Sequence, residues 1–541
     1  MEFTFASFQT IFSFVFVLLV IKILNRSRTN RSTPNLPPGP RKLPFIGNIL
    51  DAAGPLPHHT LGKLAKKYGP LMHLQLGENS TIVASSAKTA KEVMKTHDLN
   101  FAYRPFLLAA HILAYKSTNI MFSPYGDYWR QLRRICNTEL LSSKHVQSLR
   151  PIREQEVSNL IHTISKQSGS VIDLSELIYA LTYGITTRSV FGKKVKHQEA
   201  LISLVGESIA SAGGFTLTDL YPSSKVISFL SGFRPKLEKM HLRLDKMLND
   251  IIEEHKTNED GQGNANHLLV DALLKLQECG NLEVPLTIDN IKAIILVGKF
   301  LFLFEVSVSV CLGYLLSQTG QVKLKCCPLR KWVERDVIGA GSDTSSTVIE
   351  WAMSELLRNP SIMEKAQTEV RRVFSTKSTV DETDIQSLDF LKMVIKETLR
   401  LHPPAPLMLP MENREKCEIN GYEIPVKTKV VVNVWAIGRD PKYWKEPETF
   451  NPERFVNSSV DYRGLDFEYI PFGAGRRICP GISFGLANLE LPLASLLYHF
   501  DWKLANESMK SQDLDMTESF GATVKRKSVL KLVPTVVHPP V

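Results

Sequence analysis

Apolar and charged residues alternate at helical spacing through most of the chain. The pattern is clearest in four segments: Glu154–Ile164, Leu237–His255, Ile349–Leu357 and Met363–Phe374. Shorter β-branched and apolar runs are typical of strands, and they occur at Leu71–Gly77, Thr81–Ala84 and Val430–Val434. Asn420-Gly421 favours a hairpin turn, and no internal repeat is present. The pattern therefore predicts one large, mainly α domain with a small β part.

The chain opens on an apolar segment from Phe3 to Leu24, within which only Gln9 and Lys22 are strongly polar. About 20 apolar residues at ~1.5 Å each span the ~30 Å hydrocarbon core of a bilayer. The segment predicts an N-terminal transmembrane helix, with residues 1–30 as membrane anchor and basic flank. A cleaved secretory leader and a buried helix are the alternatives. A leader would carry its positive charge before the apolar stretch rather than after it.

Basic residues cluster around the end of this segment. No acidic residue lies between Glu2 and Asp51, whereas six basic residues do: Lys22, Arg26, Arg28, Arg31, Arg41 and Lys42. Positive flanks remain cytosolic, so a single-pass topology with residues 31–541 on the cytosolic side is expected. The net charge of +10 is partly explained by this cluster. Without zinc-finger spacing or an aromatic–basic RNA motif, we expect no nucleic-acid partner.

Cysteine usage argues against a disulfide framework. The chain has seven cysteines, an odd number, and no CxxC pair. Reduced thiols that face the cytosol fit this usage better.

The strongest local motif is Pro471-Phe-Gly-Ala-Gly-Arg-Arg-Ile-Cys-Pro-Gly481, followed by a helix-like run to Leu497. Glycines permit unusual backbone angles and the close approach of a flat ligand. A cysteine near a helix amino terminus has its thiolate favoured by the helix dipole. A lone cysteine in a glycine-rich loop would more often be structural, but the complete arrangement is specific.

The motif matches FxxGxRxCxG, the haem-binding signature of the cytochromes P450, at Phe472, Gly475, Arg477, Cys479 and Gly481. From Pro37 to its end the chain resembles plant microsomal cytochromes P450 of the family-71 type. The resemblance implies the cytochrome P450 fold, haem b as cofactor and the endoplasmic reticulum membrane as location. It also implies that Cys479 ligates the iron, that Phe472 packs near the sulfur and that Arg477 binds a haem propionate.

Two further motifs match structural and haem-contacting elements of the same family. Glu397-Thr-Leu-Arg400 matches ExxR, and Phe450-Asn-Pro-Glu-Arg-Phe455 contains PERF. By resemblance, Arg454 joins Glu397 and Arg400 in a buried network that supports the haem pocket. Trp129-Arg-Gln-Leu-Arg133 matches WxxxR, which implies that Trp129 and Arg133 contact the haem propionates. The alternative for this last motif is a surface amphipathic helix.

The segment Ala340-Gly-Ser-Asp-Thr-Ser345 matches the oxygen-activating part of the family's long central helix. As a bare string it is more often a helix cap. Its place before the ExxR motif and the cysteine loop favours the catalytic interpretation, in which Thr344 and Asp343 help to deliver protons.

The sequence departs from the family at two places. Where the family usually has a basic residue that contacts haem, this chain has Met411. Residues Val297–Arg335, about 39 in number, stand between segments that are almost continuous in the family. Joining Leu296 to Asp336 would restore the pattern. We interpret the insert as a retained intron, because its Phe, Leu, Val, Ser and Cys codons are T-rich; a genuine insertion loop or a second membrane segment is the alternative.

By resemblance, the protein is a monooxygenase that receives NADPH electrons through NADPH–cytochrome P450 reductase. Substrate contacts are expected from four mostly apolar stretches: Arg104–Met121, Ala212–Tyr221, Ala405–Leu409 and Ser519–Thr523. These stretches predict a small apolar ligand. The resemblance to plant family-71 members implies a plant metabolite, for which a terpenoid is favoured, with alkaloid or phenolic oxidation open. Two rival hypotheses are a reductase-independent isomerase or dehydratase, and an inactive product of mis-splicing.

Overall fold

The computed structural model describes residues 34–191, 216–257, 268–280, 282–297, 339–377, 379–506, 508–521 and 523–540. The predicted membrane anchor at residues 1–30 lies outside these ranges, as do residues 298–335 of the insert. Among the helices in the described ranges, none is both long and apolar enough to span a membrane.

Helices dominate the described chain, as the apolar pattern predicts. Three of the predicted segments fall within α9 (Arg150–Ser165), α14 (Phe233–Thr257) and α19 (Gly339–Arg358), and the fourth matches α20 (Pro360–Val373), which ends one residue before the predicted Phe374. The other α-helices are α2 (Ile49–Ala52), α3 (Pro57–Tyr68), α4 (Ala87–Lys91), α5 (Asp98–Phe101), α6 (Leu108–Leu113), α7 (Asp127–Ile135), α8 (Ser143–Ser148), α10 (Leu174–Phe191), α12 (Leu217–Leu220), α13 (Lys225–Leu230), α15 (Leu269–Cys279), α16 (Ile288–Val297), α21 (Asp389–Leu401), α22 (Val434–Ile437) and α23 (Ile482–His499).

The β part is small and divided. One sheet has the strand order β1 (Leu71–Leu76), β2 (Asn79–Ala84), β7 (Lys429–Val432), β4 (Met411–Glu412). A second has the order β3 (Ile172–Asp173), β11 (Lys531–Val536), β8 (Phe500–Leu504). Two hairpins complete the set: β5 (Cys417–Ile419) with β6 (Tyr422–Ile424), and β9 (Glu518–Ser519) with β10 (Lys525–Arg526).

Local backbone geometry explains why the hairpin prediction is correct and why one predicted strand is too long. Asn420 (φ 51°) and Gly421 (φ 79°) both adopt positive φ, so they close the predicted β5–β6 hairpin. The strand expected at Val430–Val434 ends at Val432 instead. The side chain of Asn433 accepts a hydrogen bond from the Ala436 N–H (3.0 Å), and this cap starts α22.

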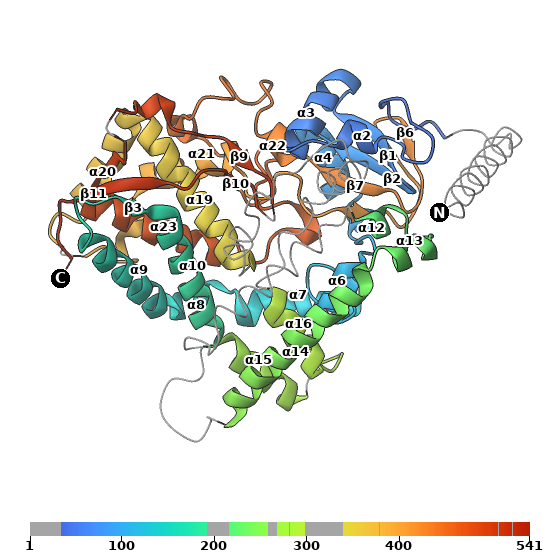
Figure 1. Ribbon diagram of the computed structural model, residues 1–541, viewed down its shortest axis with the longest axis horizontal. Coiled ribbons are helices and arrows are strands. Elements are labelled where there is room, and N and C mark those ends of the chain that lie inside the picture. The colour runs from blue at the N-terminus through green and yellow to red at the C-terminus, as the bar shows by residue number, and fades with distance from the viewer. Residues whose placement is uncertain are drawn as a thin grey trace, which may run out of the picture.

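The main hydrophobic core lies where α9, α10, α19, α20, α21 and α23 pack together. Trp351, in the middle of α19, is fully buried, and its indole N–H donates to the carbonyl of Val524. The four-stranded sheet and the helices α2, α3 and α4 form a separate region to one side of these helices (Figure 1). The candidate site lies among the central helices α7, α10, α19 and α23.

Candidate functional site

The loop before α23 depends on its glycines. Gly473 and Gly475 adopt φ of 79° and 64°, which side-chain-bearing residues rarely do. A Cβ at Gly475 would also lie 2.2 Å from the carbonyl oxygen of Met94. The Cys479 N–H donates to the carbonyl of Phe472 (2.9 Å), which folds the loop back on itself. The loop therefore holds the Cys479 sulfur in one place.

The sulfur of Cys479 faces an internal cavity and receives one main-chain N–H. The donor is Gly481, 3.4 Å from the sulfur, at the amino terminus of α23. Burial raises the pKa of the Cys479 thiol, whereas the Gly481 hydrogen bond and the charge of Arg133 lower it. A metal ion bound at this sulfur would ionise the thiol outright. The geometry suits a thiolate ligand supported by one N–H donor.

The cavity brings the two predicted halves of the site together. Cys479 and Phe472 lie on its cysteine-loop side, and Thr344 of α19 lines it as well. Its volume of about 280 Å³ is close to the lower end of the range for small-molecule sites. Of the predicted haem contacts, Trp129, Arg133 and Arg477 also line it. Gly475 does not, and its role is to shape the loop.

Arg477 points back into the protein from the cysteine loop. Its guanidinium donates to the carbonyl oxygens of Ala102 (2.8 Å), Ile120 (3.1 Å) and Ser123 (2.7 Å), and lies 4.4 Å from the ring centre of Trp129. Burial and the charge of nearby cations lower the pKa of Arg477. An arginine keeps its proton at physiological pH, so Arg477 contributes a buried positive charge to the cavity wall.

Arg133 and Trp129 of α7 are oriented by main-chain carbonyls. The Arg133 guanidinium donates to the carbonyl of Ile478 (2.6 Å), one residue before the cysteine. The Trp129 indole N–H donates to the carbonyl of Ile120 (2.9 Å). The helix α7 is thus tied to the cysteine loop, and the surface-helix alternative for this motif does not apply to Trp129, which is buried.

Arg104 is a cationic residue of the cavity wall, and no sequence motif marks it as a haem contact. It donates to the carbonyl oxygens of Leu409 (3.0 Å), Pro410 (2.8 Å) and Met121 (3.0 Å). Burial lowers its pKa to about 10. Met411, which stands where the family usually has a basic residue, is buried in β4 and lines the same cavity. A guanidinium therefore lies beside the position that Met411 leaves without charge.

The cavity fits an anionic ligand. Arg104, Arg133 and Arg477 line it, and among the described lining residues there is no Asp or Glu. Guanidinium groups bind carboxylates well because their N–H donors match carboxylate geometry. A flat group with two propionates on one edge and a metal at its centre would place carboxylates toward the arginines and iron toward Cys479. These residues fit haem b.

On the opposite side, Asp343 and Thr344 lie on α19. Thr344 faces the cavity, whereas Asp343 is buried beside it and forms an ion pair with Lys525 of β10 (Oδ1–Nζ 3.0 Å). A Cβ at Gly341 would lie 3.2 Å from both Phe484 and Thr186, so this part of α19 packs closely against α10 and α23. Lys525 had no recognisable motif in the sequence.

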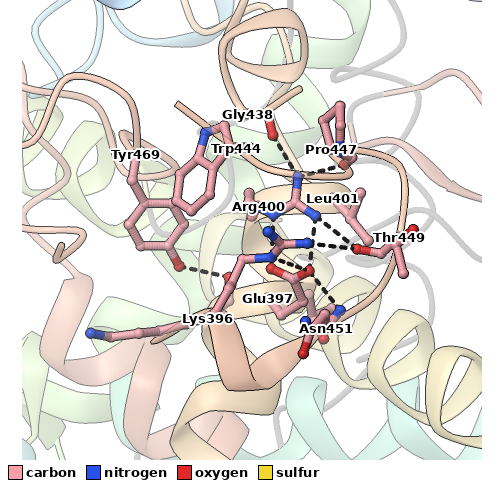
Figure 2. A network of polar contacts seen from close by, with 12 residues as sticks. Lys396, Glu397, Arg400, Leu401, Gly438, Trp444, Pro447, Thr449, Asn451 and Tyr469 are labelled. Carbon is pink, nitrogen blue, oxygen red and sulfur yellow. Dashed lines mark hydrogen bonds and ion pairs between the residues drawn. The ribbon is translucent and has the colours of Figure 1, made fainter. Parts of the chain in front are cut away.

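Glu397 and Arg400 lie in one buried network (Figure 2), and Arg454 joins it through an ion pair with Glu397. Glu397 accepts two hydrogen bonds from Arg400, both 2.8 Å, and one from Arg454, 2.9 Å. The Asn451 N–H adds a fourth (2.8 Å).

The network also holds the segment before PERF. Arg400 donates to the carbonyl oxygens of Gly438, Pro447 and Thr449, and its guanidinium lies 5.3 Å from the ring centre of Trp444. One buried cation therefore satisfies several main-chain carbonyls of a segment that carries no regular structure of its own. The three predicted residues come together as a structural support outside the cavity.

The predicted substrate segments separate into two groups. Residues of Arg104–Met121 and Ala405–Leu409 line the cavity. Leu220 packs beside β1 and β2 instead, and residues 212–215 lie outside the described ranges. The described residues of Ser519–Thr523 do not line the cavity either; the Thr523 hydroxyl hydrogen-bonds Thr347 (3.2 Å). Lining residues from α10, including Thr186 and Ser189, were not foreseen.

Comparisons with known proteins agree with this geometry. The model of the family described as "Cytochrome P450" matches residues 37–302 and 333–530. Desmethyl-deoxy-podophyllotoxin synthase from Sinopodophyllum hexandrum is 51% identical over 97% of this chain and 96% of its own. Premnaspirodiene oxygenase from Hyoscyamus muticus is 49% identical (98% and 99%), and salviol synthase from Salvia pomifera is 48% identical (97% and 96%).

Among solved structures, a zebra fish cytochrome P450 with abiraterone aligns with a TM-score of 0.68. It covers 90% of this chain and 100% of its own at 23% identity, so it supports the fold alone. The match of the family model, together with relatives near 50% identity over almost the whole chain, shows that this protein belongs to the cytochrome P450 family of monooxygenases.

Proposed function

We propose that this monooxygenase is a haem-thiolate enzyme that hydroxylates a small apolar terpenoid, with Cys479 as the axial iron ligand. The observation that carries the proposal is the cavity that Cys479 and Thr344 share with three arginines. When bound, haem supplies the activation of dioxygen and the transfer of one oxygen atom to a substrate C–H bond. NADPH–cytochrome P450 reductase would supply the electrons.

The chain's own residues would contribute binding, orientation and proton handling. Arg104, Arg133 and Arg477 hold the propionates, and the Gly481 N–H tunes the sulfur. The apolar walls exclude water. Thr344 lines the cavity and its hydroxyl would pass a proton that comes from solvent, while Asp343, buried beside it and paired with Lys525, would help to orient that path. An intact Asp343-Thr344 pair favours oxygen activation over isomerase or dehydratase chemistry.

The substrate proposal rests on the apolar lining and on two relatives named for terpenoid oxidation, premnaspirodiene oxygenase and salviol synthase. Alkaloid or phenolic oxidation is the second candidate, since another relative is named for desmethyl-deoxy-podophyllotoxin. The test is turnover of the membrane-bound enzyme with reductase, NADPH and a panel of sesquiterpene, alkaloid and phenolic substrates. A hydroxylated terpenoid supports the proposal, whereas turnover confined to phenolics or alkaloids contradicts it.

We also propose that residues 1–30 anchor the protein in the endoplasmic reticulum membrane with residues 31–541 on the cytosolic side. Exposed apolar side chains on α13, Val226, Phe229 and Leu230, support a membrane-facing surface. The helix α13 follows Tyr221, whose hydroxyl donates to the carbonyl of Phe45 in the N-terminal part of the described chain. Alkaline extraction of membranes should leave the full chain, but not a chain lacking residues 1–30, in the membrane fraction.

We propose that residues 297–335 are a retained intron rather than part of the active enzyme. The family match supports this, since it omits residues 303–332. Transcript sequencing across the region tests the proposal directly: a mature message that encodes Val297–Arg335 would contradict it. The ferrous–carbon monoxide spectrum should be recorded for the full chain and for a chain that joins Leu296 directly to Asp336. The comparison shows whether the full chain, with residues 297–335 present, binds haem.

Replacement of Arg104 by methionine should weaken haem binding, because it removes the cation beside the uncharged Met411. A charge-assisted hydrogen bond contributes about 1.5–3 kcal/mol, so haem loss should accelerate by roughly 10- to 100-fold. The measurement is the rate of haem transfer to an excess of apomyoglobin. The haem-transfer rate of Arg104→Lys should lie between those of the parent and of Arg104→Met. Arg134→Met, which removes an exposed cation on α7, should transfer haem at the parent's rate. An unchanged rate in Arg104→Met would exclude Arg104 as a haem contact.

Replacement of Lys525 by methionine should uncouple NADPH oxidation from product formation. The buried Asp343 carboxylate would lose its ion pair, and a proton-relay group that is misplaced delivers protons less selectively. We expect product per NADPH to fall about tenfold, the equivalent of ~1.4 kcal/mol, while substrate affinity stays the same. Lys527→Met, at an exposed position two residues away, is the matched control. Equal coupling in both variants would show that the pair has no part in proton delivery.

A further inference from the structure

Two adjacent histidines of α3 converge on one carboxylate. The Nε2 atoms of His58 and His59 lie 2.8 Å and 2.9 Å from Oε2 of Glu518, which belongs to β9. The three ligand-type atoms all lie within 4.8 Å of one another. None of these residues lines the cavity described above. The cluster joins the N-terminal part of the chain to its C-terminal hairpin.

Hydrogen bonding accounts for only part of this cluster. His58 Nε2 hydrogen-bonds the carboxylate of Glu518. His59 Nε2 is a buried atom at similar distance from the same oxygen, yet it is not oriented for a hydrogen bond to any described residue. Such an atom is costly to bury without a partner. A cation between the two imidazoles and the carboxylate would satisfy all three groups at once.

Neighbouring aromatic rings hold the two imidazoles in place. The side chain of His58 is fully buried and that of Glu518 is 9% exposed, whereas the His59 side chain is 34% exposed although its Nε2 atom is buried. The His59 ring stacks on Trp435 with 4.1 Å between the ring centres, and the His58 ring stacks on Phe520 with 5.7 Å between the ring centres.

Other charged groups near the cluster are already engaged. The charge of Arg439 acts on His58; its guanidinium is paired with Glu448 (3.0 Å) and lies over Trp435. The imidazole of His402, also nearby, is held by Glu355 (2.7 Å). Neither group needs to move when a cation binds between the histidines and Glu518.

We propose that His58, His59 and Glu518 form a binding site for one divalent zinc ion, with solvent as the fourth ligand. Two histidines and a carboxylate with one open position are a ligand set that zinc uses in proteins. Ligand atoms around a tetrahedral zinc lie roughly 3.3 Å apart, because each is about 2.0–2.1 Å from the ion. The observed separations of 2.8 Å and 2.9 Å are shorter than this value, so both imidazole rings must shift slightly away from the Glu518 carboxylate when the ion binds.

The bound ion would connect α3 to the β9–β10 hairpin. This hairpin carries Lys525, the partner of Asp343. The site would therefore stabilise the hairpin that positions this ion pair, at a distance from the haem cavity.

The test is zinc binding to the haem-loaded full chain by isothermal titration calorimetry. One zinc per chain is expected in the parent. Loss of a group outside the ligand set typically costs roughly 10- to 100-fold in metal affinity, so His59→Gln and Glu518→Gln should each weaken binding at least that much. His162→Gln, on α9, is the matched control and should bind as the parent does. His59→Gln changes a partly exposed side chain, and its ferrous–carbon monoxide spectrum should be unaltered.

X-ray absorption at the zinc edge identifies the ligands in the same sample. Nitrogen and oxygen at about 2.0–2.1 Å, with an imidazole pattern, are expected. Sulfur at about 2.3 Å would place the ion on cysteines and overturn the proposal. Failure of the parent to bind zinc, or full affinity in both His59→Gln and Glu518→Gln, would overturn it equally.

Discussion

Replacement of Cys479 by alanine is expected to abolish the red-shifted, thiolate-type Soret band of the ferrous–carbon monoxide complex, together with all monooxygenase turnover. The Cys479 sulfur faces the cavity, receives the Gly481 N–H and lies at the amino terminus of α23. A thiolate ligand donates electron density to the iron and favours O–O cleavage. The measurement is the difference spectrum of membranes that contain equal amounts of each protein.

Controls separate ligation from folding. Cys479→Ser keeps the size of the side chain and should retain some haem with a spectrum that is not of the thiolate type. Cys279→Ser, at the exposed end of α15, should leave the thiolate band unchanged. A thiolate-type band that persists in Cys479→Ala would assign the ligand to another cysteine and remove the basis of the proposed function.

Replacement of Glu397 by glutamine is expected to cost about 3–5 kcal/mol of stability. Glu397 and Arg400 are completely buried as side chains, and Arg454 is 10% exposed. Glutamine preserves the shape but leaves two buried guanidinium groups without their counter-ion, which is the most destabilising way to break such a network. The urea midpoint of the haem absorbance should fall accordingly, and less haem should be incorporated at the growth temperature.

A neighbouring pair supplies the control for this second result. Glu453 lies next to Arg454 in the sequence, but its ion pair with Lys365 is more than half exposed. Exposed pairs contribute about 0–1 kcal/mol, so Glu453→Gln should shift the midpoint little. If Glu397→Gln were no more destabilising than Glu453→Gln, the network would not be a support of the haem pocket.

The residues closest to the iron ligand could be predicted because local sequence determines their geometry. Glycines at 473 and 475 adopt positive φ, and the spacing from Phe472 to Cys479 is closed by one main-chain hydrogen bond. Likewise, spacing by three residues puts Glu397 and Arg400 on one face of α21. These features depend on neighbours in the chain, and the same local rules located the four long helices and the Asn420-Gly421 turn.

Contacts between segments that are far apart in the sequence could not be predicted from local spacing. Arg104 reaches the carbonyls of Leu409 and Pro410 from about 300 residues away in the sequence, and Lys525 reaches Asp343 from another element. Met411 alone suggested a missing haem contact, whereas the structure places the Arg104 guanidinium beside it. Residues 519–523 were expected at the cavity, yet Thr523 bonds to Thr347 away from it.

The sequence by itself thus determined the family motif, the helical character and the iron-ligand loop, because each follows from local spacing and backbone freedom. Only the tertiary structure decided which charges meet. The three lining arginines, the Asp343–Lys525 pair and the His58–His59–Glu518 cluster depend on how separate helices and strands pack. Packing is fixed by burial of the whole apolar core, a sum over many residues that no single segment of sequence records.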